Sequence, residues 1–125
     1  MTTTHTDLST PEALMRCFTD QLNAGDLDGL VALYEPSAVF EPQRGVVVRG
    51  HAAIRHALDE LLAIGPTIAA QTVEVLVAED IALVVNEWAM TGTAPDGTEV
   101  RQGGRSADVV RRQPDDRWLV VVDKP

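Results

Sequence analysis

The sequence predicts an α+β protein, and three observations indicate this class. Segments with helical periodicity lie in the first half of the chain, and long strand-like segments separated by turn signals fill the second half. Helices and strands that are segregated along a chain are typical of α+β rather than alternating α/β folds. The 125 residues show neither an internal repeat nor an interdomain linker. Residues 1–8 are polar and rich in threonine, so we expect a flexible tail followed by a single domain over residues 9–125.

The first helix is expected to begin at Ser9 or Thr10 and to end at Gly25. Either hydroxyl can cap the helix, and Pro11 suits its first turn because the ring fixes φ. Gly25 suits the C-terminus, since glycine adopts a positive φ without a steric penalty. The apolar positions have the spacing of one buried face: Leu14, Cys17, Phe18 and Leu22.

A second, shorter helix is expected after this tight corner, from a cap at Asp26 to Tyr34. Asp26 can accept hydrogen bonds from the unpaired N–H groups of the first turn. The helix must stop before Pro36, because the residue that precedes a proline avoids the helical region. Its apolar positions are Leu27, Leu30, Val31, Leu33 and Tyr34.

Two short strands and a third helix come next. A strand over residues 38–41 ends at Pro42, and a second strand covers residues 46–49. Gly50 then opens a helix that the Gly65-Pro66 pair ends. The rest of the chain reads as four strands, over residues 68–77, 81–93, 99–112 and 118–122.

The charge and composition exclude several classes of partner. A formal net charge of −9 at pH 7 argues against nucleic acid and anionic membranes, since both attract basic surfaces. The longest apolar runs, such as residues 81–85, are too short to span a bilayer. Residues 1–5 have neither the basic region nor the apolar core of a secretory signal. The single cysteine, Cys17, excludes an internal disulfide and suits a reducing compartment, so we expect a cytoplasmic protein.

Residues 22–33, with the Gly25-Asp26 corner at their centre, resemble the ketosteroid isomerase-like and SnoaL-like proteins of the nuclear transport factor 2-like superfamily. The resemblance implies a cone-shaped barrel, in which a curved mixed β-sheet packed with three helices encloses one apolar pocket. It also implies a homodimer formed through the exposed sheet face, and the later strands support this because they are apolar on both faces. Weaker similarity covers nearly the whole chain: Glu41-Pro42, the Gly-x-Ala-Ala-Ile pattern at residues 50–54, and the ending Trp118-x-x-x-x-Asp123-x-Pro125.

Steroid isomerases of this superfamily use a carboxylate base, with a tyrosine and a protonated carboxylic acid as donors to the enolate oxygen. The resemblance places the tyrosine at Phe18, which has no hydroxyl, and the acid at Asp108. It places the base at Pro42 without a gap and at Glu41 with a one-residue deletion. The known steroid isomerase mechanism is therefore not expected, and the candidate catalytic residues are Asp108 and Glu41.

Asp108 is the stronger candidate. Strand alternation puts Ser106, Asp108 and Val110 on one face, where the neighbours of the carboxyl are small or apolar. An unpaired carboxylate buried there would be costly, which favours a functional reason for its presence. The alternative is that Asp108 pairs with Arg105 or Arg111 on a solvated face of the sheet.

The lining of the expected pocket comes from the same strand face and from the first helix. Residues 84–90 place alternate side chains on one face, because side chains alternate along a strand. Core packing or a dimer interface is the alternative for these positions, and Glu41 is alternatively a solvated glutamate. Trp118 and Asp123 are interpreted as a core residue and a structural hydrogen-bonding group. The expected lining is Phe18, Tyr34, Phe40, Val84, Asn86, Trp88, Met90, Ser106 and Val110.

These patterns predict a pocket for a small apolar or polycyclic molecule, with cofactor-independent isomerisation or cyclisation as its candidate reaction. No metal site is expected, because His51 and His56 fall on different faces of a helix and no cluster has ligand spacing. A non-catalytic ligand-binding or accessory dimer is the alternative. An epoxide hydrolase-like protein would need an Asp-Arg-Asp set, which the sequence does not place.

Overall fold

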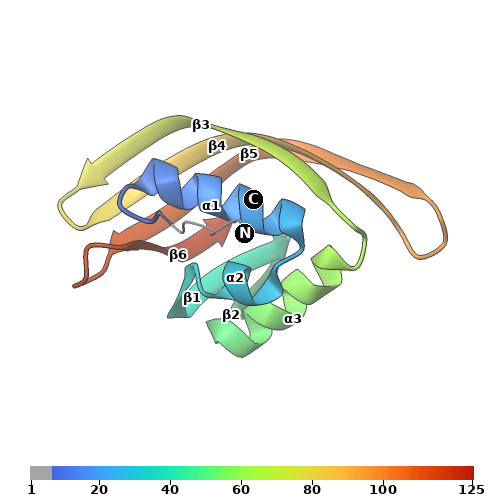
Figure 1. The fold of residues 1–125 in the computed structure, drawn as a ribbon, viewed down its shortest axis with the longest axis horizontal. Coiled ribbons are helices and arrows are strands. Elements are labelled where there is room, and N and C mark those ends of the chain that lie inside the picture. The colour runs from blue at the N-terminus through green and yellow to red at the C-terminus, as the bar shows by residue number, and fades with distance from the viewer. Residues whose placement is uncertain (1–6) are drawn as a thin grey trace, which may run out of the picture.

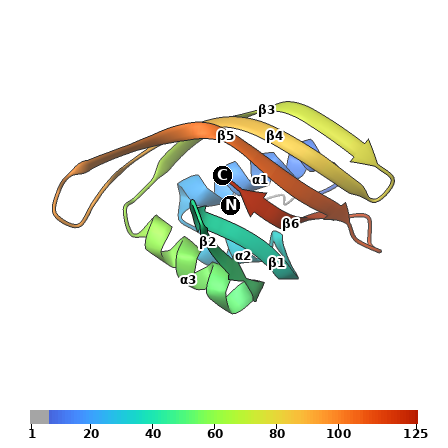
Figure 2. The same ribbon diagram turned by 180° about the vertical axis from the view of Figure 1, so that it is seen from behind.

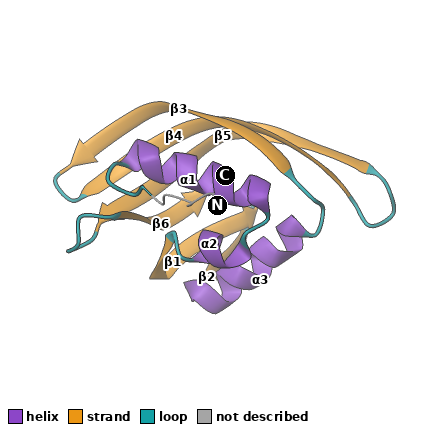
Figure 3. Cartoon of the chain, in the orientation of Figure 1, coloured by secondary structure: helices purple, strands orange, loops and turns teal. Residues whose placement is uncertain are grey.

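The computed structural model describes residues 7–125 of the chain, and it confirms the predicted α+β class. Three helices and six strands follow one another in the order α1, α2, β1, β2, α3 and β3 to β6 (Figures 1 and 3). The helices are α1 (Pro11–Ala24), α2 (Leu27–Val31) and α3 (Gly50–Leu62). The strands are β1 (Tyr34–Gln43), β2 (Val46–Arg49), β3 (Thr67–Ala78), β4 (Ile81–Thr93), β5 (Glu99–Arg112) and β6 (Trp118–Lys124).

The six strands form one open, strongly curved sheet in the order β2-β1-β6-β5-β4-β3. Every neighbouring pair is antiparallel except β1 and β6, which run parallel, so the sheet is mixed as expected. The helices lie inside the curve, where α1 passes under β3, β4 and β5 (Figures 1 and 2). The concave face therefore holds the core, and the convex face of β3 to β5 is left open.

The first two helices have the predicted corner between them. The Thr10 hydroxyl accepts the Ala13 N–H at 3.0 Å, which selects Thr10 rather than Ser9 as the cap. Gly25 adopts a φ of 70°, and its N–H bonds to carbonyls of the last turn. The Asp26 carboxylate then accepts the Gly29 N–H at 2.9 Å and caps α2.

The second helix is shorter than predicted, because it ends at Val31 and the chain is extended from Tyr34. The reason is tertiary. The Val120 N–H donates to the Leu33 carbonyl at 2.8 Å, and Tyr34 pairs with Val120 in the parallel ladder. Pairing with β6 thus overrides the helical spacing of these apolar residues. For the same reason β1 begins before the predicted residue 38, while its extension past Pro42 comes from the pairing of Gln43 with Val46 of β2.

The tail that was expected over residues 1–8 is also shorter at its C-terminal end. Residues 1–6 lie outside the described part of the chain, but Leu8 is buried in the core. Its carbonyl accepts the Trp118 N–H at 2.8 Å, so the segment before α1 is tied to the last strand. The core around it joins all three helices to the sheet and includes Leu14, Leu22, Leu30, Tyr34, Ile54, Leu58, Val84, Val110 and Val120.

In the described residues, none of the helices is long and apolar enough to cross a membrane.

Candidate functional site

A cavity of about 440 Å³ lies on the concave side of the sheet, between α1, α3 and the strands. A volume of this size is typical of small-molecule sites. Six of the nine residues expected to line a pocket are in its wall: Phe18, Phe40, Asn86, Trp88, Met90 and Ser106. The other three, Tyr34, Val84 and Val110, belong to the core beneath it. Both candidate catalytic residues, Asp108 and Glu41, also line the cavity.

Two aspartates sit side by side in the wall of this cavity. Asp108 on β5 and Asp123 on β6 are direct cross-strand partners, and their carboxyl groups are hydrogen-bonded to each other. Both side chains point to the concave face, and the residues are only 6% and 8% exposed. From the sequence, Asp123 is expected to be a structural hydrogen-bonding group, and it does accept the Tyr34 hydroxyl. The structure also places it in the wall of the cavity, which the sequence did not predict.

Asp108 is held by two further donors. The Asn86 side-chain amide donates to Asp108 Oδ2 at 3.2 Å, and the Lys124 backbone N–H donates to Asp108 Oδ1 at 3.3 Å. Asn86 is itself fixed, because its oxygen accepts the Thr72 hydroxyl at 2.7 Å and its nitrogen donates to Ser106 Oγ at 3.1 Å. These contacts run across β3, β4 and β5, so the sheet register sets the position of the carboxyl.

Tyr34 joins the pair from beneath the cavity. Its hydroxyl donates to Asp123 Oδ2 at 2.5 Å, and its side chain is almost fully buried. The ring packs edge-on against Phe18 with a centroid distance of 6.1 Å and lies 6.2 Å from Phe40. The hydroxyl is therefore committed to Asp123 and does not replace the donor that is missing at Phe18.

The electrostatics of the cluster follow from its burial. Burial raises the pKa of Asp108 well above its ordinary value, and the neighbouring Asp123 charge raises it further. Burial also raises the pKa of Asp123, while the hydrogen bonds from Asp108 and Tyr34 act in the opposite direction. The pKa of Tyr34 is raised well above its ordinary value, first by burial and then by the Asp123 charge. When the pair holds one proton, these effects favour the proton on Asp108 and the negative charge on Asp123.

Glu41 differs from the aspartates because it is ion-paired. Its carboxylate contacts Lys124 Nζ at 2.8 Å at the partly exposed wall of the cavity. The hydrogen bond from Lys124 lowers the pKa of Glu41, and a contact from the Gly45 N–H lowers it further. A carboxylate with a depressed pKa is a weak proton acceptor. Glu41 is thus less suited than the aspartates to take a proton near neutral pH.

The arginines considered as partners of Asp108 lie elsewhere. Arg105 contacts Glu87 at 2.7 Å on the convex face, and Arg111 contacts Glu35 at 3.1 Å. Within residues 7–125, no basic side chain forms an ion pair with Asp108 or Asp123. The described residues around Asp108 and Asp123 therefore do not provide the arginine that an Asp-Arg-Asp set requires.

One donor in the cavity wall has no acceptor. Trp88 Nε1 is buried without a hydrogen-bond partner among residues 7–125. A buried N–H that lacks a partner costs about 1–3 kcal/mol, so an acceptor at this position would stabilise the protein. Over the same residues, no group of three His, Cys, Asp or Glu side chains is arranged to hold a metal ion.

The SnoaL-like domain family matches residues 15–121, and the protein belongs to this family. The match confirms the resemblance seen in the sequence. No curated protein matches the chain.

Solved structures of nuclear transport factor 2-like proteins have the same fold. A ketosteroid isomerase-like protein from Erwinia carotovora atroseptica has a TM-score of 0.81 at 17% identity, with 93% of this chain and 92% of that chain covered. A candidate dehydratase of the NTF2-like family from Streptomyces avermitilis has a TM-score of 0.77 at 19% identity, with 89% of each chain covered. An NTF2-like superfamily protein from Salmonella enterica serovar Typhimurium has a TM-score of 0.80 at 18% identity, with 90% and 84% covered. Identities this low show the fold alone.

Proposed function

We propose that this protein binds a small, largely apolar organic molecule in the cavity and moves a proton on it without a cofactor. The class of reaction is isomerisation or cyclisation next to a carbonyl group. The observation that carries this proposal is a buried carboxyl pair in the wall of an otherwise mostly apolar cavity. Such a carboxyl has a pKa displaced toward neutrality, which suits a group that must both take and return a proton.

The wall of the cavity supports a ligand of this kind. Phe18, Leu22, Phe40 and Met90 present apolar surface, while Asn86 and Ser106 lie around Asp108. A rigid apolar body would fill the first part and place one polar group at the second. Trp88 Nε1 offers a further donor for a ligand oxygen.

Binding is tested first, by intrinsic fluorescence with a panel of bicyclic ketones and phenols. The chain has two tryptophans, of which Trp88 lines the cavity and Trp118 lies in the core. Ligand binding should therefore quench a signal that the Trp88→Phe variant lacks and the Trp118→Phe variant retains. A response that survives in Trp88→Phe would place the ligand elsewhere.

Proton transfer is tested by exchange of the ligand's α-hydrogen in D₂O, followed by NMR. The wild-type protein should speed the exchange of a bound ketone, and Asp108→Asn should lose this effect while still binding the ligand. Glu41→Gln is the matched control, because Glu41 lines the same cavity but is ion-paired to Lys124. Exchange that survives in Asp108→Asn and is lost in Glu41→Gln would assign the base to Glu41.

A non-catalytic ligand-binding function is the alternative, and a specific observation favours it. Phe18 occupies the position of the tyrosine donor, and the Tyr34 hydroxyl is already bonded to Asp123. An enolate formed in the cavity would thus lack this stabilising donor. Ligands that bind tightly but show no exchange above the rate in buffer would support this alternative.

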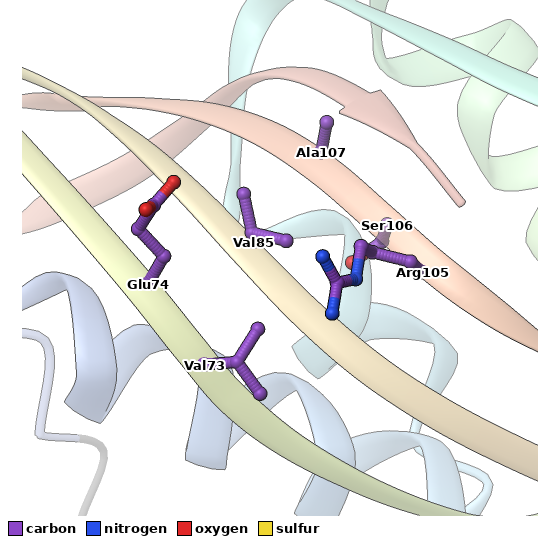
Figure 4. Close-up of a pocket in the computed structure, with 6 residues that line it drawn as sticks. All are labelled: Val73, Glu74, Val85, Arg105, Ser106 and Ala107. Carbon is purple, nitrogen blue, oxygen red and sulfur yellow. The ribbon is translucent and has the colours of Figure 1, made fainter.

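The protein is further proposed to form a homodimer through the convex face of the sheet. None of the described elements covers β3 to β5 on this side, where Val73, Leu76 and Leu83 are 41%, 57% and 39% exposed. Figure 4 shows Val73 and Val85 beside Ala107 across three strands, with Glu74 and Arg105 on opposite sides of Val85. Apolar side chains flanked by both signs of charge suit a self-complementary contact between two copies.

A further inference from the structure

Asp123 is a buried titratable group to which the proposed function assigns no role of its own. It lies on the last strand beside Asp108, and both carboxyls line the cavity. Their only charged neighbours within hydrogen-bonding distance among residues 7–125 are each other. Two like charges in direct contact and largely out of water cannot both persist.

The hydrogen bonds around the pair show where a single proton fits. Asp123 accepts the Tyr34 hydroxyl on Oδ2, and this donor stabilises a negative charge on Asp123. Asp108 accepts N–H groups of Asn86 and Lys124, one on each oxygen. A proton on Asp108 that is donated to Asp123 completes a chain from Asp108 to Asp123, with Tyr34 donating from the far side.

Two charged groups near the pair have partners of their own, and the Arg44 guanidinium, which follows β1, also lines the cavity. On β1, Glu41 pairs with the Lys124 ammonium of β6. On β5, the Arg105 guanidinium pairs with Glu87 of β4 on the opposite face. From α1 the cavity receives only side chains that do not titrate: Met15, Phe18, Thr19 and Leu22.

We propose that Asp108 and Asp123 form a carboxyl dyad that holds one proton between them, so that the site faces its ligand as a proton acceptor. This rests on the proposed function and deepens it, because it assigns a role to Asp123 and states that the site accepts a proton from its ligand. An oxyanion site would hold a neutral acid and donate to a negative oxygen. The dyad carries one negative charge and selects ligands that are neutral where they meet it: phenols or carbon acids rather than phenolates.

The proton transfer balances within the dyad. The C–H bond next to a ligand carbonyl breaks and its electron pair passes into the enolate. The proton joins Asp108 as the proton that Asp108 already holds passes to Asp123, so that each carboxyl then holds one proton. Return of one proton to a different carbon forms the new C–H bond and restores the singly protonated pair. Asp108, which contacts the ligand space and the Asn86 amide, is the catalytic residue, and Asp123 is the positioning residue that shares its proton.

The test is a pH titration of the protein labelled with ¹³C at the aspartate carboxyl carbons. In the wild-type protein Asp108 and Asp123 should titrate in two coupled steps, with the upper step well above the range of an ordinary aspartate. Asp123→Asn removes the neighbouring charge, so the Asp108 titration should move down toward the ordinary range. Asp115→Asn is the matched control, because it removes an exposed carboxylate and should leave Asp108 unchanged.

Tyr34→Phe provides a second, independent variant in case Asp123→Asn does not fold. It removes a donor to the charged form of Asp123, so the lower step should move up. A titration of Asp108 that ignores both substitutions in folded protein, or two carboxyls that ionise together in the ordinary range, would overturn the dyad. The titration needs no ligand, so a dyad without accelerated exchange in D₂O would refute the proposed function alone.

Discussion

Substitution of Asp108 by asparagine should make the stability of the protein less dependent on pH. The native pKa of Asp108 is raised, mainly by burial, above the unfolded value of about 3.9. Between these two values the native state binds a proton that the unfolded state has released. The free energy of unfolding therefore falls as the pH rises, at about 1.4 kcal/mol per pH unit for one proton.

The free energy of unfolding of the Asp108→Asn variant does not fall in this way, because the asparagine releases no proton. Its amide has the shape of the protonated acid, and an amide N–H can donate to Asp123 as the acid O–H does. Below the unfolded pKa of about 3.9 the two proteins should accordingly differ little in stability. At each higher pH the variant gains on the wild-type protein by about 1.4 kcal/mol per unit, until the native carboxyl has ionised and the difference levels off.

Urea unfolding followed by circular dichroism at pH 5, 6, 7 and 8 measures this difference. Titrations of groups away from the carboxyl pair cancel when the variant is compared with the wild-type protein at the same pH, so the difference reports the titration of Asp108 together with its effect on Asp123. Asp115→Asn is the control, because the hydrogen bond from Arg117 lowers the pKa of Asp115, so this carboxyl is ionised in both the native and the unfolded state from pH 5 to pH 8 and its substitution should give a stability difference that does not change over this range. A stability difference between Asp108→Asn and wild-type protein that stays constant from pH 5 to pH 8 would refute the reasoning.

Three further outcomes are expected. Tyr34→Phe should destabilise the protein by about 1–3 kcal/mol at pH 7 in urea unfolding, because the buried Asp123 carboxylate loses the donor at 2.5 Å; an unchanged stability would show that this bond contributes nothing net. Asn23→Ala should cost about 1 kcal/mol, since its amide donates to the Ile68 carbonyl at 3.0 Å and accepts the Ile68 N–H at 2.7 Å, and Asn23→Asp, which keeps only the acceptor, should lie between the two. Leu83→Glu should convert a dimer into a monomer in sedimentation velocity, because it puts a charge into the convex apolar face; a wild-type protein that sediments as a monomer would contradict the dimer.

Much of the fold could be predicted from local patterns. The strands β4 and β5 begin and end where the alternation and turn signals place them, at Ile81–Thr93 and Glu99–Arg112. Alternation also placed Asp108 on the same face as Ser106, and both are buried on the concave side. Periodicity works here because each of these strands has one face against the core and one against solvent.

The relation between Asp108 and Asp123 could not be predicted in this way. It depends on which residues of β5 and β6 lie opposite each other, and a register irregularity between Val109 and Val110 changes that pairing. The predicted end of α2 was wrong for a similar reason. Leu33 continues the helical pattern of the sequence, but its carbonyl accepts the Val120 N–H of β6. The one local sign of the site was an aspartate, Asp108, on the apolar face of a strand. Strand patterns do not indicate which residues of the neighbouring strands lie beside it.

The parallel pairing of β1 with β6 has a consequence for how the protein folds. The Tyr34 hydroxyl and the Asp123 carboxylate are 89 residues apart in sequence, so their bond closes most of the chain into one loop. Contacts of such long sequence separation slow folding, because the entropy of the loop is lost before the contact forms. A chain that has built β3, β4 and β5 but has not docked β6 contains Asp108 without its neighbour. The carboxyl pair therefore forms when β6 pairs with β5, and the Tyr34 hydroxyl joins it only when β6 also pairs with β1, so the titration of the pair would report on the docking of the last strand.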